Sequence, residues 1–373
     1  MEFPFAYGQI VTGSQFIDRK KELSRLKTNI NHGIHTVLIS PRGWGKSTLM
    51  NNLAKKLSKD KNLKFVFIDL LGQADELDFF REYSKEVLKT AISGLENPEI
   101  LEKKSLRSLQ QSITIENVTT GEFNISMEWE DLEKNYDRIL DLPEKLAKKK
   151  RKYIICIKEF QRIEKFKNNV KLQSWLKSVW QHHKHVIYLL CGSSRAIMEK
   201  IFLSQSNPFF NFAEIMYLSK IKKKYFSEYI ISTFEKSGKI IPKDRADKMI
   251  DMAGKVPYFV QQLAQLVWMR SSEMVIESDI QSAVKEIVSQ NGIWYLREVE
   301  RMTPPQFNYL KAVVNKEQNL SGQEVLKKYR LGSSANVAKI KKVMEEREIL
   351  DYRRQYPEFI DPFFRLWIEK NNR

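Results

Sequence analysis

The chain has 373 residues, which is enough for two or three domains with sizeable cores. Its formal net charge of +17 favours a polyanionic partner such as nucleic acid, although many lysine-rich proteins use their charge only for solubility. No apolar run approaches the roughly 18 residues that span a bilayer, and the N-terminus lacks the pattern of a secretory signal. The two cysteines lie inside apolar runs, as in reducing compartments, so we expect a cytoplasmic protein without a membrane partner.

Short apolar runs alternate with helical patterns over the first part of the chain. Strands are expected at 35–40, 63–72, 152–160 and 185–194, and helices at 16–31, 46–59, 76–92 and 130–150, the last broken near Pro143. Residues 112–129 predict a hairpin about a TTGE turn, and 96–110 are polar and predict helix or loop. Nearly continuous apolar strands between helices indicate a parallel sheet covered on both faces. We therefore predict an α/β domain, a P-loop αβα fold, over residues 1–215.

The pattern changes to helices alone from about residue 220. Four helical segments lie at 223–238, 245–254, 256–272 and 277–291. They predict a small helical lid domain over 216–292. A linker that contains TPPQ (303–306) precedes three further helices at 305–315, 321–330 and 334–347 and a short hairpin at 349–362. Three helices followed by a hairpin predict a winged helix-turn-helix domain over 293–373.

A glycine-rich turn, SPRGWGKST (40–48), lies between the first strand and the next helix. Gly43 and Gly45 allow backbone N–H groups to surround phosphate oxygens, and the helix N-terminus adds its dipole. Lys46 would reach the β- and γ-phosphates and Ser47 would ligate Mg²⁺. The first position of the usual motif is glycine and here is Ser40. The candidate loop residues for nucleotide are Pro41, Arg42, Gly43, Trp44, Gly45, Lys46, Ser47 and Thr48.

Six stretches resemble, in order, motifs of the archaeal-type ATPases of the STAND branch of the AAA+ class. They lie at 16–23, 40–49, 153–163, 189–202, 254–257 and 359–368, and so span nearly the whole chain. The resemblance implies a nucleotide domain, a lid and a winged helix, with ATP or ADP and Mg²⁺ bound between core and lid. It also implies that Phe16 and Arg19, in a box near the adenine, and Pro257, in the G-x-P motif, contact the nucleotide.

The second nucleotide motif, YIICIKEFQRI (153–163), departs from this family at one position. Relatives have an aspartate that holds Mg²⁺ through water, followed by a glutamate that polarises the attacking water. Here Glu159 is present and Lys158 occupies the aspartate position, where a protonated lysine cannot ligate a metal. Lys158 either touches phosphate or turns outward, and in both cases we predict slow hydrolysis. The alternative is that both residues form a solvated strand end.

A second departure follows the sensor strand. The family's arginine, a candidate for contacting phosphate, corresponds to Phe212 in this chain, while Arg195 remains near the strand end. Ser193 and Ser194 keep hydroxyl groups that would orient water or γ-phosphate, although serines also form turns after strands. The candidate catalytic residues are therefore Glu159, Lys158 and Ser193.

The predicted winged helix carries basic residues on its exposed side. Lys339, Lys341 and Lys342 lie opposite the apolar face of the last helix, and Arg353 and Arg354 lie in the wing. Glu345, Glu346 and Glu348 in the same segment would repel DNA, and winged helices also dock proteins or self-associate. Both a DNA and a protein partner stay open.

These patterns favour an ATP-binding switch that couples nucleotide binding to winged-helix repositioning, with slow or impaired hydrolysis. The alternative is a non-hydrolysing scaffold in which bound nucleotide only stabilises the domains. Lys158 and Phe212 leave open whether the chain is an enzyme.

Overall fold

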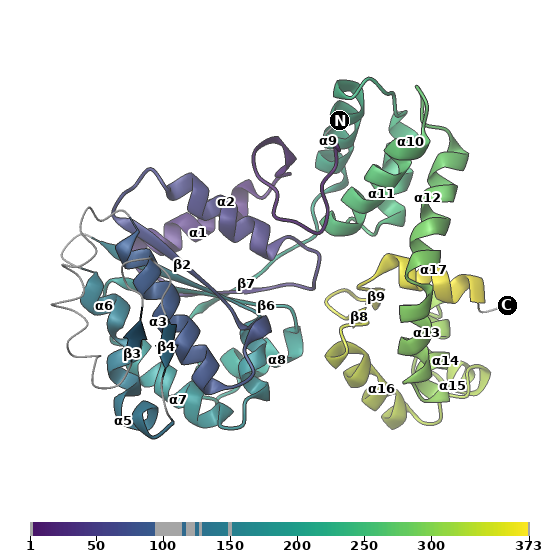
Figure 1. Ribbon diagram of the computed structural model, residues 1–373. Coiled ribbons are helices and arrows are strands. Elements are labelled where there is room, and N and C mark those ends of the chain that lie inside the picture. The colour runs from purple at the N-terminus through teal and green to yellow at the C-terminus, as the bar shows by residue number, and fades with distance from the viewer. Residues whose placement is uncertain (1–2, 94–113, 117–123, 127–128, 148–150, 372–373) are drawn as a thin grey trace. The chain divides into compact units, whose positions relative to one another are not determined.

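The computed structural model describes residues 3–93, 114–116, 124–126, 129–147 and 151–371 (Figure 1). The chain forms two compact units. The sheet unit comprises Lys20–Ser40 and Leu49–Leu218, and the helical unit comprises Met1–Arg19, Pro41–Thr48 and Ser219–Arg373. The predicted phosphate loop therefore groups with the helical unit, although the strand before it belongs to the sheet unit.

The sheet unit is built on five parallel strands in the order β2-β5-β6-β1-β7. Their bounds are β1 Thr36–Ile39, β2 Leu63–Asp69, β5 Lys152–Lys158, β6 Val186–Gly192 and β7 Glu214–Tyr217. The first four confirm the expected strands and the parallel sheet. The fifth, β7, was not predicted, because it is short and its residues are partly exposed.

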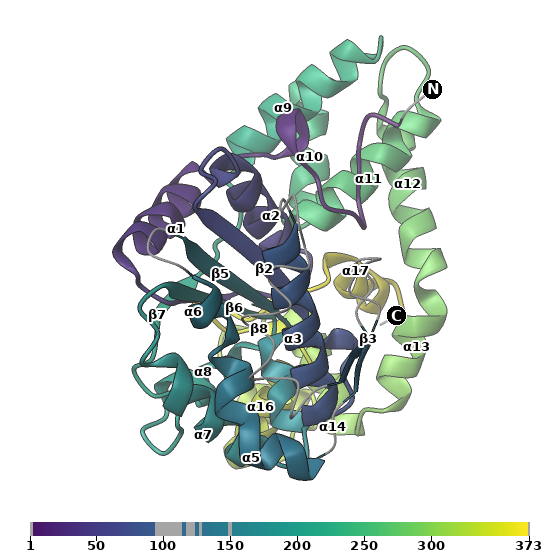
Figure 2. The same cartoon turned by 60° about the vertical axis from the view of Figure 1, so that its left-hand side comes forward.

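Helices cover both faces of this sheet, as predicted. Figures 1 and 2 show α1 and α2 on one face and α3, α5, α7 and α8 on the other. Their bounds are α1 Lys20–His32, α2 Lys46–Leu57, α3 Glu76–Ile92, α5 Trp129–Leu140, α6 Leu142–Leu146, α7 Asn169–Trp180 and α8 Arg195–Leu203. Alternate strand residues, such as Ile155 and Ile157, enter the core on the α3 side. Cys191 points to the other face, where its Sγ lies 3.0 Å from Met50 Sδ of α2.

Two predictions of local detail are confirmed. Strands β3 (Thr114–Glu116) and β4 (Asn124–Ser126) pair antiparallel, as expected of the hairpin at 112–129. The helical segment 130–150 is broken between Leu140 and Leu142, and Pro143 lies in the first turn of α6, where its missing N–H costs no hydrogen bond. The TTGE turn and the segment 96–110 lie outside the described residues.

The helical unit contains the lid and the winged helix. The lid helices are α9 Lys223–Lys236, α10 Lys243–Met252, α11 Pro257–Arg270 and α12 Glu277–Gln290. The winged helix consists of α14 Pro304–Val314, α15 Gln323–Lys328, α16 Ser334–Glu346, the paired strands β8 Leu350–Asp351 and β9 Glu358–Phe359, and α17 Pro362–Asn371. Both sets of helices confirm the predicted pattern, and their apolar residues join one continuous core.

The expected linker before residue 303 is wrong in part, since Gly292–Glu300 forms helix α13 directly after α12 (Figure 1). Tyr295 anchors this helix: its ring stacks on Phe364 at 5.0 Å and its hydroxyl donates to Asp361 Oδ2 at 3.0 Å. Ile293 and Trp294 are 70% and 52% exposed, so the apolar residues of α13 do not mark one buried face. Helix α17 was not predicted either. No helix in the described ranges is both long and apolar enough to cross a membrane.

Candidate functional site

The phosphate loop has the backbone that its glycines predict. Gly43 and Gly45 have φ values of 77° and 89°, in the left-handed region that glycine adopts without steric cost. Helix α2 begins at Lys46, so its first N–H groups and its dipole face the loop. Lys46 Nζ donates to the Pro41 carbonyl at 3.2 Å, which holds the lysine over its own loop. Ser47 and Thr48 follow in the first turn of α2.

Arg19 ties this loop to the start of the lid. Its guanidinium donates to the Trp44 carbonyl at 3.2 Å and to the Ser219 carbonyl at 2.6 Å, and its side chain is buried. Phe16, three residues earlier, ends the short 3-10 turn Gly13–Gln15. The sequence therefore identifies Arg19 as a residue of this region, but the structure gives it a role in fixing the loop main chain.

The start of α11 packs directly against the loop. Pro257 is the first residue of this helix, and the next N–H, of Tyr258, donates to the Gly43 carbonyl at 3.2 Å. A Cβ on Gly43 would lie 3.1 Å from Tyr258 Cβ and 3.4 Å from Val256 Cγ1. Gly43 is therefore required both for its positive φ and for the close approach of α11. Tyr258 was not among the predicted site residues.

Two side chains of the loop reach the winged helix. Arg42 Nε lies 3.3 Å from Glu348 Oε2, just before β8. The Arg353 guanidinium stands over the Trp44 ring at 4.4 Å, and the Lys220 ammonium lies 5.7 Å from the same ring. Such cation–π contacts are worth about 0.5–2 kcal/mol, with the larger values where the pair is desolvated, and Trp44 is buried. The phosphate loop is therefore connected to the wing through side chains.

In the sheet unit, Lys158 is paired with a carboxylate on the neighbouring strand. Lys158 and Asp69 are register partners at the ends of β5 and β2, and Lys158 Nζ lies 3.9 Å from Asp69 Oδ2. The ammonium also lies 6.0 Å from the Phe67 ring. With the two side chains 22% and 49% exposed, the pair adds at most about 1 kcal/mol. Asp69 was not predicted, although it ends the apolar run FVFID.

Glu159 adopts a strained backbone and belongs to a hydrogen-bond network. Its φ and ψ of 54° and 38° are left-handed, which is uncommon for a residue other than glycine. Gln161 Nε2 donates to Glu159 Oε2 at 2.8 Å and to Ser193 Oγ at 3.0 Å. Ser193 Oγ in turn donates to Glu159 Oε2 at 3.3 Å. The ends of β5 and β6 therefore hold Glu159 and Ser193 together, and Gln161 is a positioning residue that we did not predict.

The residues that follow strand β6 pack against or pair with other residues of the sheet unit. Phe212 packs in the core, stacked on His35 at 4.6 Å. Burial of His35 lowers its pKa to about 4, so this ring is neutral at pH 7. Arg195 pairs with Glu199 at 2.7 Å and lies 5.5 Å from the Tyr217 ring. Phe212 is therefore a core residue, with the Lys177 ammonium 4.9 Å from its ring.

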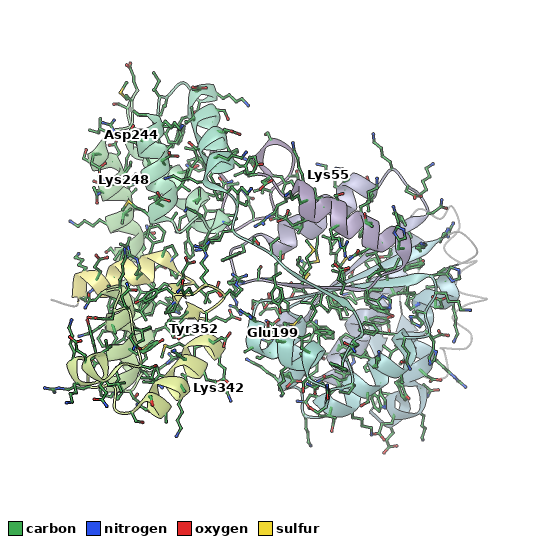
Figure 3. All side chains as sticks on the ribbon, turned by 180° about the vertical axis from the view of Figure 1, so that it is seen from behind. Lys55, Glu199, Asp244, Lys248, Lys342 and Tyr352 are labelled. Atoms are coloured by element: carbon green, nitrogen blue, oxygen red, sulfur yellow. The ribbon has the colours of Figure 1, made fainter. Side chains whose placement is uncertain are left out.

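The candidate DNA residues fall into two groups. On α16, Lys339 is exposed, Lys341 is half-buried, and Lys342 projects outward with 78% of its side chain exposed (Figure 3). In the wing, Arg353 is only 18% exposed and binds both carboxylate oxygens of Asp351. Arg354 is 62% exposed and pairs with Glu358 at 2.8 Å. Arg353 is therefore engaged within the protein, whereas Lys339 and Lys342 face solvent, the latter with Glu346 at 3.8 Å.

Comparison with known proteins assigns the class. A family model described as an ATPase domain predominantly from Archaea matches residues 16–276, and one described as a probable winged helix domain matches 293–370. The chain belongs to this archaeal ATPase family and carries a C-terminal winged helix. No curated protein matches it.

Solved structures share the fold at low identity. A Walker-type ATPase of Pyrococcus abyssi superposes with a TM-score of 0.67 at 12% identity, over 95% of this chain and 96% of that one. The ORC2 protein of Aeropyrum pernix, in ADPNP–ADP complexes, gives 0.59 at 12% identity, over 99% and 96%. The Aeropyrum pernix ORC1 protein in complex with DNA gives 0.50 at 13% identity, over 95% and 93%. At these identities the likeness concerns the fold alone.

We predict that Gly43→Ala weakens ADP binding by about tenfold or more, because the new Cβ meets Tyr258 and the left-handed backbone becomes strained by about 1 kcal/mol or more. Isothermal titration calorimetry on the full chain measures the affinity. Gly238→Ala is the matched control, since it also has a positive φ of 76° but no atom within 4 Å of the new Cβ. Equal effects of the two substitutions on ADP affinity would contradict the role of Gly43.

Proposed function

We propose that this protein is an ATP-binding switch whose phosphate loop controls the pose of the winged helix, with turnover that is slow or lost. The observation that carries the proposal is the pair of loop contacts, Arg42 with Glu348 and Trp44 with Arg353. A change of loop conformation on nucleotide binding acts on both contacts at once. Membership of an ATPase family and the ADPNP–ADP complexes of the structurally similar ORC2 protein support a nucleotide ligand.

The loop residues fit a nucleotide phosphate. Two left-handed glycines, a helix N-terminus and Lys46 together make an anion site. Mg²⁺ would be held by the Ser47 hydroxyl together with phosphate oxygens, and would neutralise charge on the phosphates. Lys158, paired with Asp69, adds no ligand to such an ion. Glu159, held by Gln161 and Ser193, would orient a water. Nucleotide binding is therefore better supported than turnover.

The switch predicts that Arg353 transmits the state of the loop to the wing. Hydrogen exchange of residues 350–359, measured with and without ADP on the full chain, should change in the native protein. Arg353→Ala should abolish most of that change and shift ADP affinity by about threefold or more, as expected for loss of one cation–π contact. Arg354→Ala is the control, because its partner is Glu358 and not the loop.

An exchange response that persists unchanged in Arg353→Ala would contradict this coupling. A wing that never responds to nucleotide, in a protein that binds ADP, would instead favour the scaffold in which nucleotide only stabilises the fold. Absence of any ATP or ADP binding would overturn the proposed function as a whole.

Turnover is expected to depend on the charge pair at the ends of β2 and β5. Lys158→Asp alone would set a second carboxylate beside Asp69 and repel it, since these positions are register partners. The double substitution Asp69→Asn with Lys158→Asp avoids that repulsion. We predict that Mg²⁺-dependent phosphate release is slow in the native protein and rises at least about tenfold, or roughly 1.4 kcal/mol in barrier, in the double variant.

Adding Glu159→Gln to the double variant should remove the gain, because it removes the carboxylate that polarises water. Native turnover at rates typical of enzymes, about 1–10³ s⁻¹, would show that the lysine does not impair hydrolysis.

DNA binding through α16 is the second part of the proposal. The +17 net charge and the exposed Lys339 and Lys342 support it, and the similar ORC1 fold was solved in complex with DNA. Lys342→Ala should weaken duplex binding for all sequences and reduce the slope of log K against log salt by about one. Lys243→Ala on the lid, also exposed, is the control. An unchanged slope in Lys342→Ala would remove α16 from the interface.

A further inference from the structure

A cavity in the helical unit is lined in part by the wing and has no assigned ligand. Its volume is ≈ 600 Å³, within the range of roughly 300–1,000 Å³ that is usual for small-molecule sites. It is bounded by the end of α10, the end of α14, the segment 355–359 that contains β9, and the start of α17. These elements belong to one compact unit with one core, so the cavity is a feature of that unit.

The cavity wall combines apolar and polar surface in about equal parts. Met252, Val313, Val314, Phe359 and Pro362 contribute the apolar part of the lining. Val313 and Val314 are 4% and 8% exposed, so they are held in the core and each presents only a small apolar surface to the cavity. Such a surface binds the hydrophobic body of a ligand, while a few polar groups at the rim orient it.

The charged groups of the wall leave a net positive potential. Two acids and three bases line it: Asp251, Glu358, Lys220, Lys316 and Arg365. Each acid is already held by two cations. Asp251 lies 2.6 Å from Lys223 and 3.5 Å from Lys255, and Glu358 lies 2.8 Å from both Lys220 and Arg354. Lys316 lines the cavity and is exposed, and no ion pair within 4.0 Å is found for it in the part of the chain that the structure describes.

The backbone fixes Lys316 at that mouth. It follows α14 with a φ of 58°, in the left-handed position that usually carries glycine after a helix. Its N–H donates to Val313 and that of Glu317 to Ala312, which closes the helix end. This helix end fixes the main chain of Lys316 beside the cavity that its side chain lines.

We propose that this cavity binds a small amphipathic anion: a molecule with one carboxylate, sulfonate or phosphate group and an apolar body. Lys316 holds the anionic group, and Arg365, which also lies 3.4 Å from Glu369, is the second base beside it. The apolar body rests on the valines of α14 and on Phe359. A bare inorganic anion lacks the part that fits the apolar wall. A cationic ligand would be repelled by the three bases of the wall. The two acids of the wall are already paired with cations and would not attract it.

One residue of the cavity wall lies near the candidate phosphate loop. Lys220 lines the wall, pairs with Glu358, and lies 5.7 Å from the Trp44 ring. An anion in the cavity would attract the Lys220 ammonium away from Glu358. The distance between this ammonium and the Trp44 ring would then change. This regulatory consequence rests on the proposed function, whereas the anion site itself does not.

The probe for the test is 8-anilinonaphthalene-1-sulfonate, whose sulfonate and aromatic rings match the proposed chemistry. Its fluorescence gives an affinity on the full chain. Lys316→Glu should weaken binding by roughly tenfold, since it reverses a charge near the anion. Lys316→Met, which keeps the apolar stem, should weaken binding about threefold. Lys285→Glu, an equal charge change at an exposed site on α12, should leave the affinity unchanged.

Hydrogen exchange locates the probe: protection is expected at 313–318 and 355–362. Sulfate at the same concentration should not displace it. Protection elsewhere, equal affinities in all three variants, or full displacement by sulfate would overturn the amphipathic-anion site. These measurements need no nucleotide, so a protein that binds the probe but not ADP refutes the switch alone. One that binds ADP but not the probe refutes only the cavity site.

Discussion

The left-handed backbone of Gly43 is the constraint on which the arrangement around the phosphate loop depends. Its φ of 77° turns the chain so that the Gly43 carbonyl meets the N–H of Tyr258, and the missing Cβ allows α11 to approach. The next residue, Trp44, is then placed against Arg353 and Lys220. One turn of main chain therefore contacts the lid through its backbone and the wing through a side chain.

The strand ends of the sheet unit combine a retained acid with an altered neighbour. Glu159 has a left-handed backbone and accepts hydrogen bonds from Gln161 and Ser193. Lys158 is balanced locally by Asp69. A lysine at a strand end adds a positive charge, and here the neighbouring strand supplies the opposite charge. The sheet tolerates the lysine for this reason, whatever the rate of hydrolysis.

Periodicity was sufficient to predict most of the fold, because long buried strands and amphipathic helices each impose a pattern on the sequence. It failed where packing overrides that pattern. The four residues of β7 are partly exposed, and α13 exposes Ile293 while it buries Tyr295. The contacts of Trp44 with Arg353 join residues about 300 positions apart and leave no local signal. For the site, single residues such as Lys46 could be identified from the loop motif, but their partners could not.

Arg353 has two candidate roles that exclude each other. Its guanidinium binds both oxygens of Asp351 and lies over the Trp44 ring, so a DNA phosphate would compete with contacts that are already made. If the wing contacts DNA through Arg353, the contact with the loop must break. Linkage then requires that DNA change nucleotide affinity by the same factor by which nucleotide changes DNA affinity. Lys339 and Lys342 lie on another element, so their exposure does not depend on the contact of Arg353 with Trp44. In the proposed switch, a change in the loop therefore acts on the wing through Arg353, and the lysines of α16 are outside that contact.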